Sequence, residues 1–178
     1  MHIVSMMGSG ELGREIDVPA IIESLDAEYG VEATAHSDSM STIRLEERGP
    51  ALTLYRTGTF QIRGTDSRES LLQANDDLLN ALKGIGLDLE EVSFEQNNAV
   101  FLEDFETRIQ LGALAILLGL ENVEYEPEQF PGVIYRPPDL ETVMLIFASG
   151  KSIISGTTSK QIAHQSASHL RDKLKELE

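Results

Sequence analysis

The sequence contains no cysteine, no secretory leader and no long apolar run. Zero cysteines among 178 residues exclude a disulfide scaffold and thiolate metal sites. The N-terminal MHIVSMMGSG lacks the basic stretch and apolar run of a signal peptide. The longest apolar run, LGALAILLGL at residues 111–120, covers about half of a bilayer span and is predicted to be a buried helix. We therefore expect a cytoplasmic, nucleoid-associated protein with no membrane partner.

Basic residues are also scarce. Fourteen Lys and Arg residues against 30 Asp and Glu residues give a formal net charge of −16. This sign opposes binding to a polyanion, and one interpretation is an acidic protein that never contacts nucleic acid. The other is adaptation to multimolar salt, where a Debye length of about 3 Å at 1 M screens repulsion from phosphates. Lysine scarcity fits the second interpretation, but composition alone leaves both open.

The sequence patterns of enzymes are weak. Gly8–Gly13 (GSGELG) matches G-x-G-x-x-G, but the parallel βαβ continuation of a dinucleotide site is missing, so a turn is expected there. GKS at 150–152 resembles the end of a P-loop that lacks its earlier glycine, and a hairpin turn is expected. The histidines form no i, i+4 pair, and His164 and His169 are expected on the surface of the last helix. We expect no catalysis, metal or cofactor, and a nucleotide-binding enzyme is the least favoured alternative.

What the sequence does contain is an internal duplication. Residues 53–65 (TLYRTGTFQIRGT) and 145–157 (LIFASGKSIISGT) are two versions of one segment, at an offset of 92. A fixed offset near half of the chain implies two similar half-folds, related by a pseudo-twofold axis if they pack together. We place the repeats at residues 1–92 and 93–178. Such a body suits a partner that is itself nearly twofold, such as duplex DNA.

Each half is predicted to contain strands and two helices in the same order. Capping residues and apolar stripes predict helices near residues 17–28, 67–84, 111–118 and 159–177. Strands are predicted near 2–7, 31–35, 42–46, 52–56, 60–63, 98–102, 133–136, 142–147 and 152–155. Residues 87–96 are expected to join the halves. Strands mostly in meander order predict an α+β fold, an antiparallel sheet with helices on one face.

The segment YEPEQFPGVIYR at 125–136, with LIFASGK at 145–151 and a downstream SGT, closely resembles the second repeat of archaeal TATA-box-binding proteins. GELGREID at 10–17 is similar to the first-repeat pattern, and the acidic balance resembles the versions from salt-loving archaea. The resemblance implies a divergent paralogue with a saddle-shaped sheet of about ten strands, its concave face against the DNA minor groove and its helices on the convex side. It implies a general transcription initiation factor whose partners are promoter DNA, transcription factor B and, indirectly, RNA polymerase.

The resemblance also implies which residues bind DNA. Phe130 and Phe147 match the second repeat's wedge phenylalanines, which enter a base step and kink the duplex. Strand alternation favours a shared exposed face for Val143, Leu145 and Phe147. The other implied contacts of the second repeat are Val100 and Ile153 in the apolar floor, Asn98 as the central asparagine, Ser155, and the phosphate contacts Arg136 and Lys151. In the first repeat the implied set is Met7, Arg44, Tyr55 and Arg63.

The first repeat departs from the family pattern, because Phe130 corresponds to Asp38 and Phe147 to Tyr55 at the offset of 92. Half of the expected DNA face has therefore lost its wedge pair and become more polar. In the second repeat, the loop with Glu126 and Glu128 docks transcription factor B in the resembling family; solvated loop carboxylates are the alternative. Two hypotheses follow: a promoter-binding factor, or a same-fold paralogue that acts mainly on proteins with weak or no DNA binding.

Overall fold

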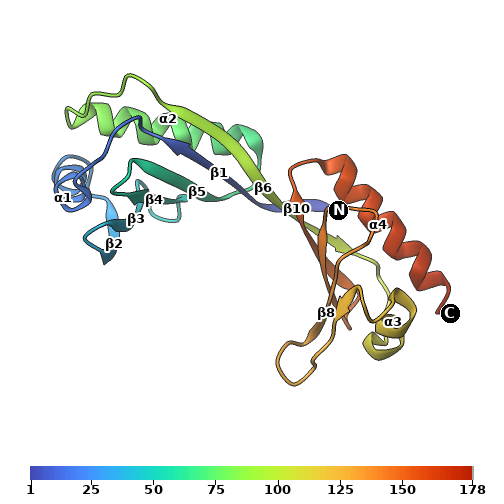
Figure 1. Cartoon of the computed structure of the whole chain (residues 1–178). Coiled ribbons are helices and arrows are strands. Elements are labelled where there is room, and N and C mark those ends of the chain that lie inside the picture. The colour runs from blue at the N-terminus through green and yellow to red at the C-terminus, as the bar shows by residue number, and fades with distance from the viewer. Residues whose placement is uncertain (178) are drawn as a thin grey trace. The chain divides into compact units, whose positions relative to one another are not determined.

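The computed structural model describes residues 1–177 and contains a ten-stranded antiparallel sheet with four helices, which confirms the predicted α+β fold (Figure 1). Hydrogen-bonded strands follow the order β2-β3-β4-β5-β1-β6-β10-β9-β8-β7. The chain forms two compact units, which we call the N-terminal unit (Ser5–Asn97) and the C-terminal unit (Met1–Val4 with the chain from Asn98 onward).

The N-terminal unit contains strands from β1 to β5 and helices α1 and α2, with bounds β1 (His2–Glu11), α1 (Val18–Tyr29), β2 (Glu32–Ser37), β3 (Met40–Arg44), β4 (Ala51–Tyr55), β5 (Thr59–Thr65) and α2 (Arg68–Gly84). Asp17 caps α1 by accepting a hydrogen bond from the Ala20 N–H at 3.1 Å. Both helices pack on one face of the strands, where Leu54 and Phe60 are fully buried. The other face of these strands is uncovered by helices.

The C-terminal unit repeats this plan, with bounds β6 (Ser93–Asp104, of which the part from Asn98 belongs to this unit), α3 (Leu111–Leu118), β7 (Val123–Glu124), β8 (Gly132–Tyr135), β9 (Val143–Phe147), β10 (Lys151–Thr157) and α4 (Lys160–Lys175). Helix α3 coincides with its predicted range, and it is buried along one side only, since Ile116 is 74% exposed. Helix α4 packs against β10, where Ile154 is fully buried. No helix within residues 1–177 is both long enough and apolar enough to span a membrane.

The duplicated glycines have matching structural roles. Gly64 and Gly156 have φ of +88° and +87°, and each lies where the strand register shifts, in β5 against β1 and in β10 against β6. Gly58 and Gly150 also have positive φ, and a Cβ on either would lie within 2.1 Å of a backbone carbonyl oxygen. Only glycine combines that conformation with so close an approach. The sequence duplication therefore corresponds to a duplication of backbone geometry, and the hairpin turn expected at Gly150 is confirmed.

Three local predictions were wrong. Gly8 and Gly10 lie inside β1 instead of in a turn, and glycine is needed there because the Phe94 and Phe60 rings occupy the space of a side chain. Strand β6 begins at Ser93, so the connection expected over 87–96 is shorter. His169 is half-buried, and its Nε2 lies 2.8 Å from the Tyr135 hydroxyl; it is not a free surface residue. Strand β7 was not predicted, since two residues give no periodic signal.

Candidate nucleic-acid interface

The candidate interface of the C-terminal unit is the face of β6, β8, β9 and β10 that α3 and α4 do not cover. Along β9, Val143, Leu145 and Phe147 are half-buried on this face, whereas Met144 and Ile146 are fully buried on the helix side. This confirms the alternation predicted for β9. A strand with one face on the core and one face open gives this period of two.

Apolar side chains form a continuous row across this face. Leu102 in β6 pairs with Ile153 in β10, Ile153 pairs with Leu145 in β9, and Leu145 pairs with Ile134 in β8. All are half-buried. Leu102 and Ile134 were not among the predicted residues, although the alternation of β6 and β8 places them on the open face. We call these four residues the apolar row.

Phe130 and Phe147 lie side by side at one edge of the open face, with ring centroids 5.8 Å apart and planes inclined at 58°. Both are half-buried, so each ring keeps a free side. Gly132 pairs with Phe147, and a Cβ on Gly132 would lie 2.9 Å from the Phe130 ring and 2.8 Å from the Ile146 carbonyl oxygen. The glycine of the FPG triplet therefore makes room for the aromatic pair.

Three further predicted residues lie on β6 and β10. Ser155 pairs with Val143, two residues along each strand from the Ile153–Leu145 pair of the apolar row, and Val100 is half-buried in β6. Asn98 is half-buried, and its Oδ1 is enclosed with no hydrogen-bond partner among residues 1–177. A buried amide oxygen without a partner is costly unless a ligand or water supplies a donor.

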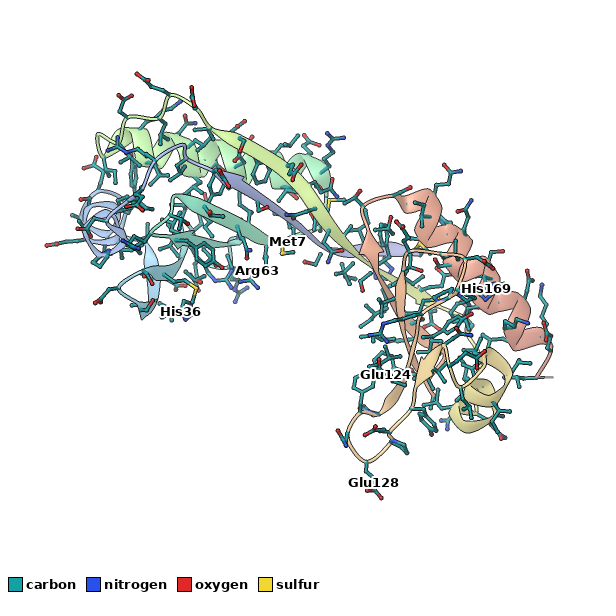
Figure 2. All side chains as sticks on the ribbon, in the orientation of Figure 1. Met7, His36, Arg63, Glu124, Glu128 and His169 are labelled. Atoms are coloured by element: carbon teal, nitrogen blue, oxygen red, sulfur yellow. The ribbon has the colours of Figure 1, made fainter. Side chains whose placement is uncertain are left out.

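The predicted phosphate contacts of the C-terminal unit differ in availability. Lys151 is exposed at the start of β10 and pairs by register with Asp104. Arg136 is exposed too, but its guanidinium lies 2.5 Å from the Glu124 carboxylate, so its charge is already paired. Figure 2 shows Glu124 on the short strand β7, at the start of the loop that has Glu128 at its tip. The structure thus leaves Lys151 the more available cation of the two.

The open face of the N-terminal unit contains the remaining predicted residues. Met7 in β1 pairs with Arg63 in β5, and Figure 2 shows both side chains on the side of the sheet away from α2. Arg44, at the end of β3, donates a hydrogen bond to the Gly49 carbonyl. Tyr55 pairs with Met40, which follows the β2–β3 turn. No aromatic pair forms at this edge, because the turn has Asp38 where the other unit has Phe130.

Glu126 and Glu128, the predicted partner contacts, are exposed in the loop between β7 and β8. Backbone hydrogen bonds from Gln129 and Phe130 to the Glu126 carbonyl, each 2.9 Å, hold this loop in a defined turn. Figure 2 shows Glu128 at its tip, directed away from the sheet. The loop therefore presents two free carboxylates next to the aromatic pair.

Two units, each with helices on one face of antiparallel strands and an uncovered opposite face, define a duplicated α+β protein. A family model described as "Transcription factor TFIID (or TATA-binding protein, TBP)" matches residues 1–85 and 93–177. The chain belongs to the TATA-binding protein family of transcription factors.

Relatives and solved structures agree with this assignment. The chain is 38% identical to TATA-box-binding protein C of Halobacterium salinarum, over 99% of this chain and 98% of the relative. It is 33% identical to the TATA-box-binding protein of Archaeoglobus fulgidus, over 99% and 96% of the two chains. The solved TBP of Methanococcus jannaschii superimposes with a TM-score of 0.80 at 32% identity, over 98% of each chain. The archaeal character implied by the motifs fits these relatives, and the salt-loving character implied by the acidic balance fits the Halobacterium relative.

Proposed function

We propose that this protein is a promoter-binding initiation factor that binds A·T-rich duplex DNA in the minor groove, mainly through the C-terminal unit. The observation that supports this most is the apolar row beside the Phe130–Phe147 pair. The minor groove over A·T pairs presents only acceptor atoms and no amino group, so an apolar floor with few polar groups fits it. Family membership agrees with this function and with a non-enzymatic role.

The wedge mechanism follows from the aromatic pair. Insertion of Phe130 or Phe147 into a base step costs a few kcal/mol of unstacking, which buried ring surface offsets. The two rings already lie 5.8 Å apart, so little reorganisation is needed before insertion. Flexible TA steps lower the deformation cost, which adds selection by DNA shape. Asn98, with its enclosed Oδ1, has an amide N–H pair that can donate to base acceptors.

We further propose that the β7–β8 loop recruits transcription factor B, and through it RNA polymerase. Glu126 and Glu128 offer charge complementarity to a basic partner surface. Helix α3 packs against β7; Ile116 on α3 and Leu120 just after it are 74% and 70% exposed. Exposed apolar side chains next to a charged loop are typical of protein-binding surfaces.

A second candidate function is regulation through protein contacts with weak or no DNA binding. The N-terminal unit favours it, because Asp38 and Tyr55 occupy the positions of the wedge pair and the chain has a net charge of −16.

DNA bending separates the two functions. We would measure energy transfer between dyes at the ends of an A·T-rich duplex in multimolar KCl, with and without transcription factor B. Bending supports the promoter-binding function. Binding to transcription factor B without any affinity for DNA would support the second function.

A further inference from the structure

The open face of the N-terminal unit has a cross-strand row that is polar throughout. Ser9 in β1 pairs with Gln61 in β5, Gln61 pairs with Thr53 in β4, and Thr53 pairs with Thr42 in β3. We call these four residues the polar row. Their neighbours along each strand, such as Ile43 and Ile62, are fully buried on the helix side. The polar row is therefore on the open face of its unit.

The polar row occupies the positions that the apolar row occupies in the other unit. At the offset of 92, Thr42, Thr53 and Gln61 correspond to Ile134, Leu145 and Ile153, and at 93 Ser9 corresponds to Leu102. The strand pairings match as well, since each row crosses four strands in the same order. The same backbone arrangement thus has a polar row on the open face of one unit and an apolar row on the open face of the other.

Hydrogen bonds orient the polar row. The Thr42 hydroxyl lies 2.9 Å from His36 Nε2 and 3.0 Å from the Thr53 hydroxyl, and Asn97 Nδ2 donates to the Ser9 hydroxyl at 2.5 Å. Thr53 is only 2% exposed, so it acts by holding Thr42 in place. Gln61 lies half-buried between Thr53 and Ser9, and its amide contributes one acceptor oxygen and two N–H donors. Each hydroxyl also has lone pairs that can accept a further bond.

The apolar row and the polar row would interact differently with the base edges of a minor groove. A G·C pair adds the guanine N2 amino donor to the acceptors that every pair presents there. Above the apolar row this donor loses its water and gains no partner, which is unfavourable. Above the polar row, the Gln61 carbonyl or the Thr42 and Ser9 hydroxyls can accept from it, and the same groups can donate to the acceptors of an A·T pair.

We propose that Gln61, with Thr42 and Ser9, makes the N-terminal unit tolerant of G·C pairs, so that base selection for A·T rests on the C-terminal unit. This inference rests on the proposed minor-groove binding and adds an asymmetric specificity to it. The protein then recognises a composite site, strictly A·T on one side and mixed on the other.

The test compares duplexes that differ by one G·C pair placed at successive positions of an A·T-rich site. Dissociation constants are measured by fluorescence anisotropy in multimolar KCl. The chain has no cysteine, so Ser37→Cys in β2 or Ser149→Cys between β9 and β10 gives a single attachment point for a DNA-cleaving iron chelate. Cleavage then assigns which half of the site each unit contacts. We expect a G·C pair to weaken binding by about tenfold or more under the C-terminal unit, and by less than about threefold under the N-terminal unit.

Two reciprocal variants identify the residues responsible. Gln61→Ile with Thr42→Ile copies the apolar row and should raise the G·C penalty under the N-terminal unit to about tenfold, where the penalty is the ratio of the variant's own dissociation constants for the G·C-containing and all-A·T duplexes. Ile153→Gln should reduce the penalty under the C-terminal unit, and it keeps the test valid if the first variant does not fold. Equal penalties in both halves of the wild-type complex would overturn this inference while leaving minor-groove binding intact. Failure to bind any duplex would overturn the proposed function and this inference together.

Discussion

Among single residues, Gly132 determines how the two phenylalanines can lie. Its missing side chain leaves the space that the Phe130 ring and the Ile146 carbonyl oxygen occupy. The N-terminal unit has no such pair, because Asp38 occupies the position that corresponds to Phe130. Asp38 cannot act as a wedge, since its carboxylate would lose hydration next to the acceptor atoms of the minor groove. Tyr55 has the bulk of a wedge, but its hydroxyl needs a hydrogen-bond partner inside the base stack. We therefore expect any capacity to kink DNA to be concentrated at Phe130 and Phe147.

This asymmetry predicts a single strong kink. Phe130→Ala combined with Phe147→Ala should abolish bending, and Asp38→Phe should increase it, because ring insertion drives unstacking. The wild-type bend should be well below the roughly 80° that is characteristic of the family's kinked complexes. Energy transfer between dyes on the duplex ends measures each bend. Leu120→Ala, an exposed apolar change just after α3, is the matched control and should leave the bend unaltered when transcription factor B is absent. Full bending by the double alanine variant would show that the aromatic pair is not the wedge.

Tyr135 gives a pH-dependent prediction at the same scale. Burial, together with the nearby Asp139 carboxylate, raises the pKa of the Tyr135 phenol above its ordinary value of 10.0. Because this pKa is higher in the folded than in the unfolded chain, the neutral phenol contributes fully to the stability of the fold below pH 10. That contribution is lost as the pH rises through the pKa of the folded chain. The free energy of unfolding should therefore fall at alkaline pH.

Denaturant titrations across this pH range measure that loss, and Tyr135→Phe should reduce it because phenylalanine has no proton to release. Tyr125→Phe, in the same unit, is the matched control and should retain the wild-type profile. If Tyr135→Phe loses stability with pH as steeply as the wild type, the alkaline transition does not originate at Tyr135.

At the scale of elements, the loop between β7 and β8 presents two exposed carboxylates, which we propose contact a partner. Replacing Glu126 and Glu128 by arginine should weaken ternary-complex formation with transcription factor B at least several-fold, since charge complementarity governs encounter and specificity. The fold should persist, because both residues are exposed. Electrophoretic mobility shifts with A·T-rich DNA and transcription factor B measure the effect. The same charge reversal at the exposed Glu46 and Glu47 of the N-terminal unit is the control. Equal ternary-complex formation by both double variants would refute the loop assignment.

Most elements could be predicted from local sequence, whereas features that depend on long-range pairing could not. Capping residues and apolar stripes predicted all four helices, with α3 at its observed bounds. The strand position of Gly8 and Gly10 could not be predicted, because their neighbours Phe94 and Phe60 are distant in the sequence. Pairing of Arg136 with Glu124 also depends on the two-residue strand β7, which has no periodicity.

The candidate site shows the same division. Family resemblance and strand alternation predicted residues that lie together on the open face, such as Leu145 and Ile153. Leu102 and Ile134 emerged only when the register placed them in the same row. The polar row likewise depends on four strand pairings, none of which is visible in any one segment.

For the whole molecule, net charge is the dominant physical constraint. Many of the acidic residues lie on helices and connections and are exposed, for example Glu23 and Asp26 on α1 and Glu90 after α2. Their repulsion acts at long range and opposes both compaction and approach to DNA. Salt screens such repulsion, with a Debye length that shrinks from about 10 Å at 0.1 M to about 3 Å at 1 M.

We therefore predict that folding and DNA binding both require high salt. Each phosphate contact gives a counterion-release slope of about −0.9 in log affinity against log salt, and Arg136, one of the predicted phosphate contacts, is already paired with Glu124. Relief of repulsion by a net charge of −16 should outweigh that slope, so affinity should rise or stay constant with salt. Anisotropy titrations from low to multimolar KCl, with circular dichroism at each step to separate unfolding from lost binding, measure both effects. A steep loss of affinity by a protein that remains folded would mean that phosphate contacts, and not the apolar row and its wedge, dominate the complex.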